Sequence, residues 1–164
     1  MTLAYFIRHA KAKNRLKWSE RDDLRPLSKV GFEQAVALPA LYEGQPFSRL
    51  FSSPYVRCMQ TLEPLAAARG LPLETSDELA EGAPIGVALE LMLSVSGEGP
   101  AAFCTHADVI MDSIEELVAA GVPLDGPLEF KKAATWILET SERGFVSGRY
   151  LPPPSGVSSR VATP

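Results

Sequence analysis

The sequence predicts an α/β protein, a three-layer α/β/α sandwich with a mostly parallel central sheet. Short apolar segments recur at 3–7, 49–53 and 101–105, and each is typical of a buried strand. Segments with apolar residues at helical spacing lie between them. Strands that alternate with helices form parallel sheets covered on both faces. The chain has 164 residues, about the length of one domain.

The first strand, at 3–7, leads into a charged segment over 10–27 that shows no apolar periodicity, so we predict a long loop there. Ser28 has the side chain that a helix N-cap needs, and a helical pattern of apolar residues follows it. Pro39 is expected to kink or shorten this helix, because a proline inside a helix removes a backbone donor.

The strand at 49–53 ends before Pro54, and a helix over 55–69 follows, with Gly70 as its stop and Pro64 as an interruption. The rest of the chain predicts a strand near 72–75, a helix over 85–95, a strand over 101–105, a helix over 108–120 that stops at Gly121, and a hairpin of strands at 135–138 and 145–146 around Gly144. These elements complete the alternation of strands and helices.

Before residue 150 no linker divides the chain, so we predict a single domain over 1–150 and a Pro/Ser-rich tail over 151–164, whose composition is typical of disorder. The first residues contain no basic segment, and Arg8 ends the first apolar run. We therefore expect neither a signal peptide nor a spanning helix, and a cytoplasmic protein. A monomer or weak dimer is the default for such a domain.

Composition excludes several classes of protein. Apolar residues make up 46% and charged residues 22%, which excludes a mainly disordered chain or a coiled coil. Two cysteines 46 positions apart, Cys58 and Cys104, cannot form a disulfide framework or a four-ligand zinc site. The net charge of −4 argues against a nucleic-acid or membrane partner. Residues 8–25 hold seven basic and three acidic residues, a local excess that favours a small anion site.

Both histidines of the chain, His9 and His106, directly follow predicted buried strands. Ligands of open α/β sheets bind outside the carboxyl ends of the strands, so the two side chains are expected to meet there. Arg8 precedes the first histidine, and Arg57 lies at the start of a predicted helix. Helix N-termini favour anions, and a guanidinium clamps phosphate oxygens with two hydrogen bonds.

These residues belong to motifs that resemble those of the histidine phosphatase superfamily. The matching segments, in chain order, are Arg8-His9-Ala10, Leu24-Arg25-Pro26-Leu27-Ser28-Lys29-Val30-Gly31, Ser52-Ser53-Pro54-Tyr55-Val56-Arg57-Cys58-Met59-Gln60-Thr61 and Thr105-His106. The length resembles the small SixA-type phosphohistidine phosphatase branch, and the implied fold is the phosphoglycerate mutase-like one. Ala10 departs from the commoner glycine of the first motif, but it leaves almost the same space for a phosphate.

The resemblance implies that His9 is the nucleophile and forms a covalent phosphohistidine that water hydrolyses. Arg8, Arg57 and His106 would bind and stabilise the transferring phosphoryl group. Glu81 resembles the general acid of the family, and Glu78 and Asp108 are its competitors. The further substrate-binding candidates are Lys11, Arg15 and Ser53. The basic residues Lys11, Lys13, Arg15, Lys17 and Arg21 either steer an anionic substrate or form a solvated charged loop.

The resulting prediction is a metal-independent phosphatase, without cofactors, that acts on a phosphorylated substrate. Protein phosphohistidine is the first candidate substrate, by resemblance to SixA. The charged loop also resembles phosphatase domains fused to Nudix hydrolases in actinobacterial nucleotide-sanitising proteins. The alternatives are therefore a nucleotide or small-molecule phosphomonoester phosphatase, and a non-catalytic module that binds a phospho-ligand. With two histidines and no clustered carboxylates, a dinuclear metal site is not expected.

Overall fold

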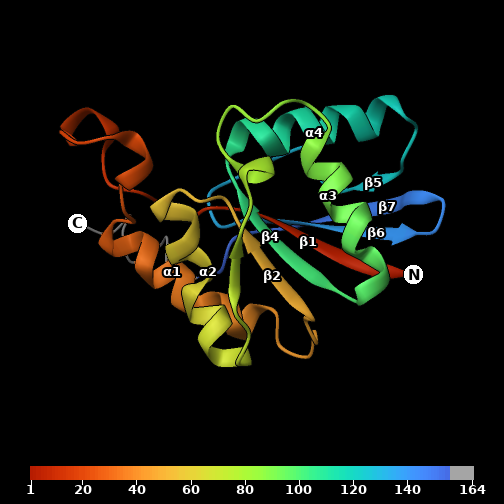
Figure 1. The fold of residues 1–164 in the computed structure, drawn as a ribbon, viewed down its shortest axis with the longest axis horizontal. Helices are drawn as coiled ribbons and strands as arrows, with labels where there is room; N and C mark the ends of the chain where they lie inside the picture. Colours follow the sequence, from red (N-terminus) through yellow and green to blue (C-terminus); the bar gives the residue numbers. More distant parts are fainter. Residues whose placement is uncertain (156–164) are drawn as a thin grey trace.

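The structure, a computed structural model, describes residues 1–155, and a central sheet lies between two layers of helices (Figure 1). Within these residues the sheet has seven strands in the order β3-β2-β4-β1-β6-β7-β5. Their bounds are β1 Thr2–Arg8, β2 Arg49–Ser52, β3 Leu73–Thr75, β4 Ala101–Thr105, β5 Leu124–Asp125, β6 Thr135–Ser141 and β7 Gly144–Leu151. From residue 156 on, the predicted tail lies outside the described residues.

The pairing confirms the mostly parallel sheet. β1 pairs in parallel with β4, β4 with β2, and β2 with β3, whereas β6 runs antiparallel to both β1 and β7. The parallel strands β1 and β4 bring Arg8 opposite Thr105, so the residues that follow them, His9 and His106, leave the same edge of the sheet. The closing hairpin is longer than predicted, and the two-residue strand β5 was not predicted.

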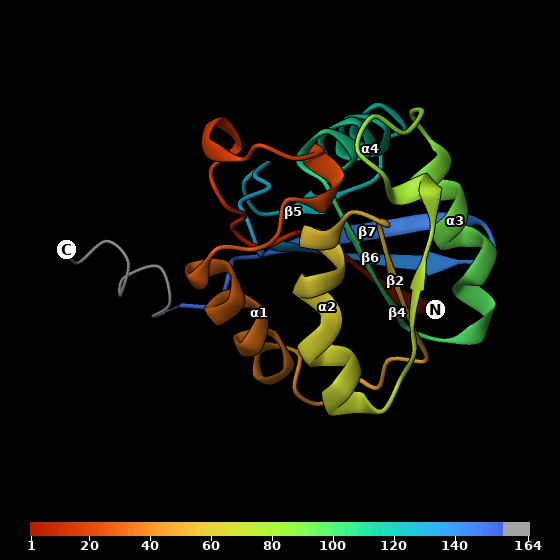
Figure 2. The same cartoon turned by 60° about the vertical axis from the view of Figure 1, so that its left-hand side comes forward.

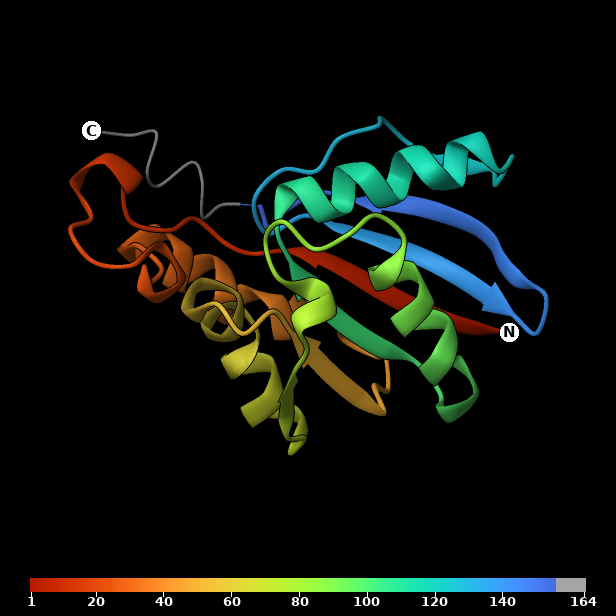
Figure 3. The same ribbon diagram turned by 45° about the horizontal axis from the view of Figure 1, so that its top comes forward.

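Successive side chains of β1 point alternately into the two layers of the core, one on each face of the sheet. Ala4 and Phe6 pack with the helices α3 (Val87–Val95) and α4 (Ala107–Ala119) on one face. Figure 3 shows these two helices lying over the sheet. Tyr5 and Ile7 pack with α1 (Lys29–Leu41) and α2 (Val56–Arg69) on the other, where the two helices lie side by side (Figure 2). Successive side chains of a strand point to opposite faces, so one buried strand serves both layers. The predicted three-layer sandwich is confirmed.

The helices follow their predicted bounds within about two residues, and both internal prolines are accommodated. The Ser28 hydroxyl accepts a hydrogen bond from the Gly31 amide (3.1 Å) and caps α1, which continues past Pro39 to Leu41. α2 likewise continues past Pro64 to Arg69 and ends at a left-handed glycine. No helix in the described part of the chain is long and apolar enough to cross a membrane.

The segment predicted as a loop over 10–27 contains two 3₁₀ turns, Arg15–Lys17 and Asp22–Leu24, and a bridge between Ala12 and Leu27. Polar contacts hold it together. The buried Arg25 guanidinium donates to the Lys13 carbonyl (2.7 Å) and to the Asp22 carboxylate (3.0 Å). Because these contacts are not apolar, the segment shows no periodicity in the sequence although it is well defined.

Candidate active site

His9 lies directly beyond β1, with its amide hydrogen-bonded to the Thr105 carbonyl of β4 (3.0 Å). Its side chain is only 7% exposed, and Nδ1 lies 2.7 Å from the Ala10 carbonyl oxygen. A carbonyl oxygen can only accept, so Nδ1 carries the proton and donates it. The other ring nitrogen, Nε2, therefore keeps its lone pair in the neutral imidazole, which is the form a nucleophile needs.

The surroundings keep this imidazole neutral. Burial and, to a smaller extent, the nearby guanidiniums of Arg57, Arg8 and Arg25 lower the pKa of His9 from 6.5 to about 3, although the hydrogen bond to the Ala10 carbonyl acts in the opposite direction. Both effects disfavour the charged form of a histidine, because burial removes water and like charges repel. At neutral pH the Nε2 lone pair is available.

His106 is the N-cap residue of α4, and its ring centroid lies 5.4 Å from that of His9. Its Nε2 atom is 2.9 Å from the Ser53 hydroxyl, while its Nδ1 atom is buried with no hydrogen-bond partner among the described residues. Burial, followed by the proximity of His9, lowers the pKa of His106 to about 2. The second histidine is therefore also neutral.

Arg57 projects from the first turn of α2 and is fully buried. Its two terminal nitrogens donate to the Asp22 carbonyl (2.8 Å) and the Asp22 carboxylate (3.0 Å), and a weaker contact reaches Glu81 (3.4 Å). The Arg57 Nε atom has no partner among the described residues. The same holds for the buried Nε of Arg8, whose Nη1 donates to the Phe130 carbonyl (2.9 Å) and whose pKa is lowered by burial.

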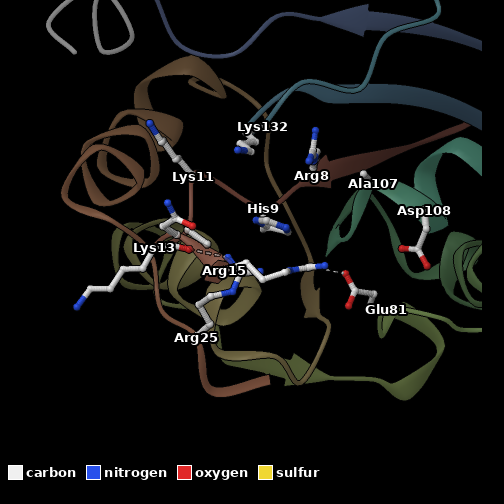
Figure 4. A pocket seen from close by; sticks show the side chains of 12 residues that line it. Arg8, His9, Lys11, Lys13, Arg15, Arg25, Glu81, Ala107, Asp108 and Lys132 are labelled. Atoms are coloured by element: carbon white, nitrogen blue, oxygen red, sulfur yellow. Dashed lines mark hydrogen bonds and ion pairs between the residues drawn. The ribbon is translucent and has the colours of Figure 1, made fainter. Parts of the chain in front are cut away.

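A cavity of about 680 Å³ opens over His9 (Figure 4). Its wall consists of Arg8, His9, Lys11, Ala12, Lys13, Asn14, Arg15, Arg25, Glu81, Ala107, Asp108 and Lys132. Seven residues with predicted roles are thus brought together on the wall, namely Arg8, His9, Lys11, Lys13, Arg15, Glu81 and Asp108. Arg57, His106 and Ser53 lie behind it, in contact with wall residues or with one another.

Some basic residues of the charged loop lie elsewhere. Lys17 and Arg21 are exposed and do not line the cavity, and Arg21 pairs with Asp23 (2.6 Å). Two basic wall residues, Arg25 and Lys132, have no predicted role. The position of Arg25 in the Arg-Pro-Leu motif could have indicated that this residue belongs to the site. Lys132 had no such signal, because the turn that carries it is far from every motif in the sequence.

The three candidate acids differ in their contacts. The Glu81 carboxylate pairs with Arg57 (3.4 Å) and Arg15 (3.5 Å). One Asp108 oxygen accepts from the Gly82 amide (2.8 Å), and its other oxygen is buried without a partner among the described residues. Glu78 is exposed in a 3₁₀ turn and is not on the cavity wall. Of the three acids, Asp108 alone both lines the cavity and has a carboxylate oxygen without a partner among the described residues.

Ala10 is fully buried, and its amide donates to the Thr61 hydroxyl (2.9 Å). Within the described chain Ala133 is the only non-glycine residue with a positive φ, so alanine at position 10 carries no left-handed strain. Residues 1–155 contain no group of three or more His, Cys, Asp or Glu side chains that could hold a metal ion.

Comparison with known proteins identifies similar sequences and folds. The family model described as histidine phosphatase superfamily (branch 1) matches residues 4–84. A curated 8-oxo-(d)GTP phosphatase of Mycolicibacterium smegmatis is 32% identical over 152 residues, which are 90% of this chain and 47% of that protein. The chain thus spans about half the length of this relative.

Solved structures share the fold. The protein histidine phosphatase SixA complexed with tungstate has a TM-score of 0.74 at 21% identity, covering 92% of this chain and 95% of that chain. YhfR of Bacillus stearothermophilus has a TM-score of 0.71 at 17% identity, covering 88% and 94%. A phosphoserine phosphatase of Entamoeba histolytica, in complex with 3-phosphoglyceric acid, has a TM-score of 0.69 at 14% identity, covering 96% and 99%.

Proposed function

Because the chain belongs to the histidine phosphatase superfamily, we propose that it is a phosphatase that transfers a phosphoryl group to His9 and then to water. The observation that carries the proposal is the Nδ1 contact of His9 with the Ala10 carbonyl (2.7 Å), which leaves Nε2 unprotonated. Nε2 attacks phosphorus, the bond to the leaving oxygen breaks, and water later cleaves the P–N bond. No metal ion takes part in these steps.

The unpartnered buried nitrogens support phosphate binding beside His9. Arg8 Nε, Arg57 Nε and His106 Nδ1 are all buried without partners in the described chain. A buried donor without a partner loses about 1–3 kcal/mol, which a phosphoryl oxygen would restore. Asp22 positions the Arg57 guanidinium through two hydrogen bonds (2.8 and 3.0 Å). These donors stabilise the charge on the transferring group.

A leaving alkoxide needs a proton, and Asp108 is the better-placed donor. Asp108 lines the cavity and has one carboxylate oxygen without a partner among the described residues, whereas the Glu81 carboxylate is held by two guanidiniums. Glu81 then acts on Arg57 and Arg15 rather than on the leaving group. A phosphohistidine substrate depends less on a proton donor, because its leaving group is an imidazole nitrogen.

Two substrate classes have support. Protein phosphohistidine is favoured by the fold shared with SixA, and a nucleotide by the 8-oxo-(d)GTP phosphatase that is 32% identical. A turnover screen with a phosphohistidine protein, a nucleoside triphosphate and p-nitrophenyl phosphate, all in the presence of a chelator, tests the function. We expect phosphate release from at least one of them, lost in His9→Ala. Ligand binding without turnover would instead indicate a non-catalytic module.

A further inference from the structure

The cavity over His9 carries more positive charge than one phosphoryl group needs. Two of its wall residues are acidic, Glu81 and Asp108, and six are basic: Arg8, Lys11, Lys13, Arg15, Arg25 and Lys132. The whole chain, in contrast, has a net charge of −4. A concentration of one sign of charge in a cavity attracts ligands of the opposite sign.

Acidic neighbours neutralise only part of this charge. Arg15 and Arg25 both pair with Asp22, at 3.7 and 3.0 Å. Within residues 1–155, by contrast, no carboxylate lies within ion-pair distance of the Lys11 or Lys132 ammonium group. In the view of Figure 4 the Lys132 side chain lies between those of Lys11 and Arg8, above the His9 ring, and the Lys11 ammonium group points away from that ring. Both unmatched charges therefore belong to the wall of the cavity that His9 also lines.

The backbone holds Lys132 at this place at a conformational cost. The next residue, Ala133, is fully buried with a φ of 63°, a left-handed conformation that is strained for a non-glycine residue. Its amide hydrogen-bonds to the carbonyls of Arg8 (3.1 Å) and His9 (3.3 Å), and the Arg8 amide donates to Ala134 (3.1 Å). The turn is thus fixed to the backbone of the catalytic segment.

Among residues 1–155 no carboxylate pairs with the Lys132 ammonium group, so its charge is not stabilised by an ion pair there. Burial lowers the pKa of Lys132, and the like charges of Arg8, Lys11 and Arg25 lower it further. An anion bound between these side chains would attract each of the positive charges and offset the repulsion between them. The cavity volume of about 680 Å³ is in the range of sites that enclose whole small molecules, and a single phosphoryl group fills only a part of it.

We propose that Lys132 and Lys11 form a second phosphate subsite beside His9, and that the protein hydrolyses the terminal phosphate of a di- or triphosphate ester. This inference rests on the phosphatase function proposed above. His9 Nε2 attacks the terminal phosphorus, and the anhydride P–O bond breaks. The electron pair stays on the bridging oxygen, which becomes a terminal oxygen of the leaving phosphate. Water then attacks the phosphohistidine, releases inorganic phosphate and returns the electron pair to Nε2.

The two lysines stabilise the negative charge that the leaving phosphate gains. A phosphate has a second pKa of about 6, so it departs without a proton from an acid. The subsite therefore predicts selectivity for phosphoanhydrides, whose leaving group is itself a phosphate, over alkyl phosphate esters, whose leaving group needs a proton.

The test compares Lys132→Met with Lys131→Met, a matched control on the same turn. The Lys131 side chain is 66% exposed and pairs with Glu129 outside the cavity. Substrates are GDP and p-nitrophenyl phosphate. We expect Lys132→Met to lower kcat/KM for GDP by about 10- to 100-fold, the effect of losing a charged hydrogen bond, and to lower kcat/KM for p-nitrophenyl phosphate by a clearly smaller factor, whereas Lys131→Met leaves both substrates within about twofold. Equal losses on both substrates, or no loss on GDP, would overturn the subsite.

A binding measurement separates this inference from the catalytic one. Titration calorimetry with inorganic pyrophosphate and inorganic phosphate, on His9→Ala protein, needs no turnover. We expect pyrophosphate to bind at least about tenfold more tightly than phosphate, and the additional change Lys132→Met to remove the difference. Equal affinities for the two anions before that change would reject the subsite. If the protein hydrolyses p-nitrophenyl phosphate through His9 but binds pyrophosphate no more tightly than phosphate, the subsite is rejected and the proposed phosphatase function stands.

Discussion

A single hydrogen bond determines the chemistry available to His9. The Ala10 carbonyl accepts the Nδ1 proton (2.7 Å), and burial holds the pKa of the ring at about 3. The imidazole is thereby both neutral and oriented with Nε2 free of the proton, without a carboxylate partner. The hydrogen bond to His9 comes from the backbone carbonyl of Ala10 and not from its side chain. Alanine can therefore replace the commoner glycine here without loss of this bond.

The two acidic residues of the wall are expected to behave differently when neutralised. Asp108→Asn removes the proposed proton donor, so we expect kcat for an alkyl phosphate to fall about 100-fold, while p-nitrophenyl phosphate, whose leaving group needs no proton, changes little. Glu81→Gln alters the surroundings of Arg57 and should lower both rates by a similar factor. A loss confined to the alkyl phosphate in Glu81→Gln would assign the acid to Glu81.

The residues that could be predicted from sequence are those that follow regular elements. His9 and His106 come directly after buried strands, and Arg57 begins a helix, so position in the fold fixes their neighbourhood. Asp22 and Lys132 could not be predicted. Their places depend on hydrogen bonds of an irregular loop and on a strained turn, and neither leaves a periodic signal.

At the scale of elements, the start of α1 holds the cavity loop. The Lys11 carbonyl accepts hydrogen bonds from the Ser28 amide (2.9 Å) and hydroxyl (3.0 Å). Gly31 lies so close that a Cβ atom added there would be 1.9 Å from the same carbonyl oxygen. The close approach requires glycine for reasons of space, and it connects the helix to a wall residue of the cavity.

Gly31→Ala should therefore displace the loop at Lys11. Because backbone atoms must move, we expect a loss of about 1–3 kcal/mol in the free energy of unfolding, measured by urea denaturation, and a lower kcat/KM. Gly97→Ala is the control, since no heavy atom lies within 4 Å of its added Cβ and its φ is not positive. Equal stability of the two variants would show that the contact does not hold the loop.

Most elements could be predicted from apolar spacing and from caps such as Ser28, because these signals are local. The exceptions depend on tertiary contacts. Pro39 and Pro64 suggest breaks in their helices, yet α1 and α2 pack against each other and against the sheet, and both continue. β5 has only two residues and exists through its pairing with β7, which no local pattern indicates.

For the whole molecule, the two buried histidines predict a stability that depends on pH. Their pKa values are about 3 and about 2 in the folded protein, against about 6.5 when unfolded. Below pH 6.5 the unfolded chain binds more protons, so the free energy of unfolding falls as the pH falls. We expect a loss of about 1 kcal/mol per histidine between pH 6.5 and 5.5, measured by urea denaturation.

The double variant His9→Asn, His106→Asn contains no histidine, because the chain has only two. Its unfolding free energy should vary little over the same interval, whatever its absolute value, since the carboxylates with lowered pKa values titrate at lower pH. An unchanged slope in this variant would show that other groups cause the pH dependence.

The covalent intermediate is the most direct test of the account. The protein is mixed with a phosphate-labelled donor, stopped within milliseconds in alkaline detergent, and the labelled peptide is mapped by mass spectrometry. We predict a label that is stable in base and lost in acid, on the peptide that contains His9, and absent from His9→Ala. A label of equal amount in His9→Ala, or turnover with no protein-bound phosphate at any time, would contradict it.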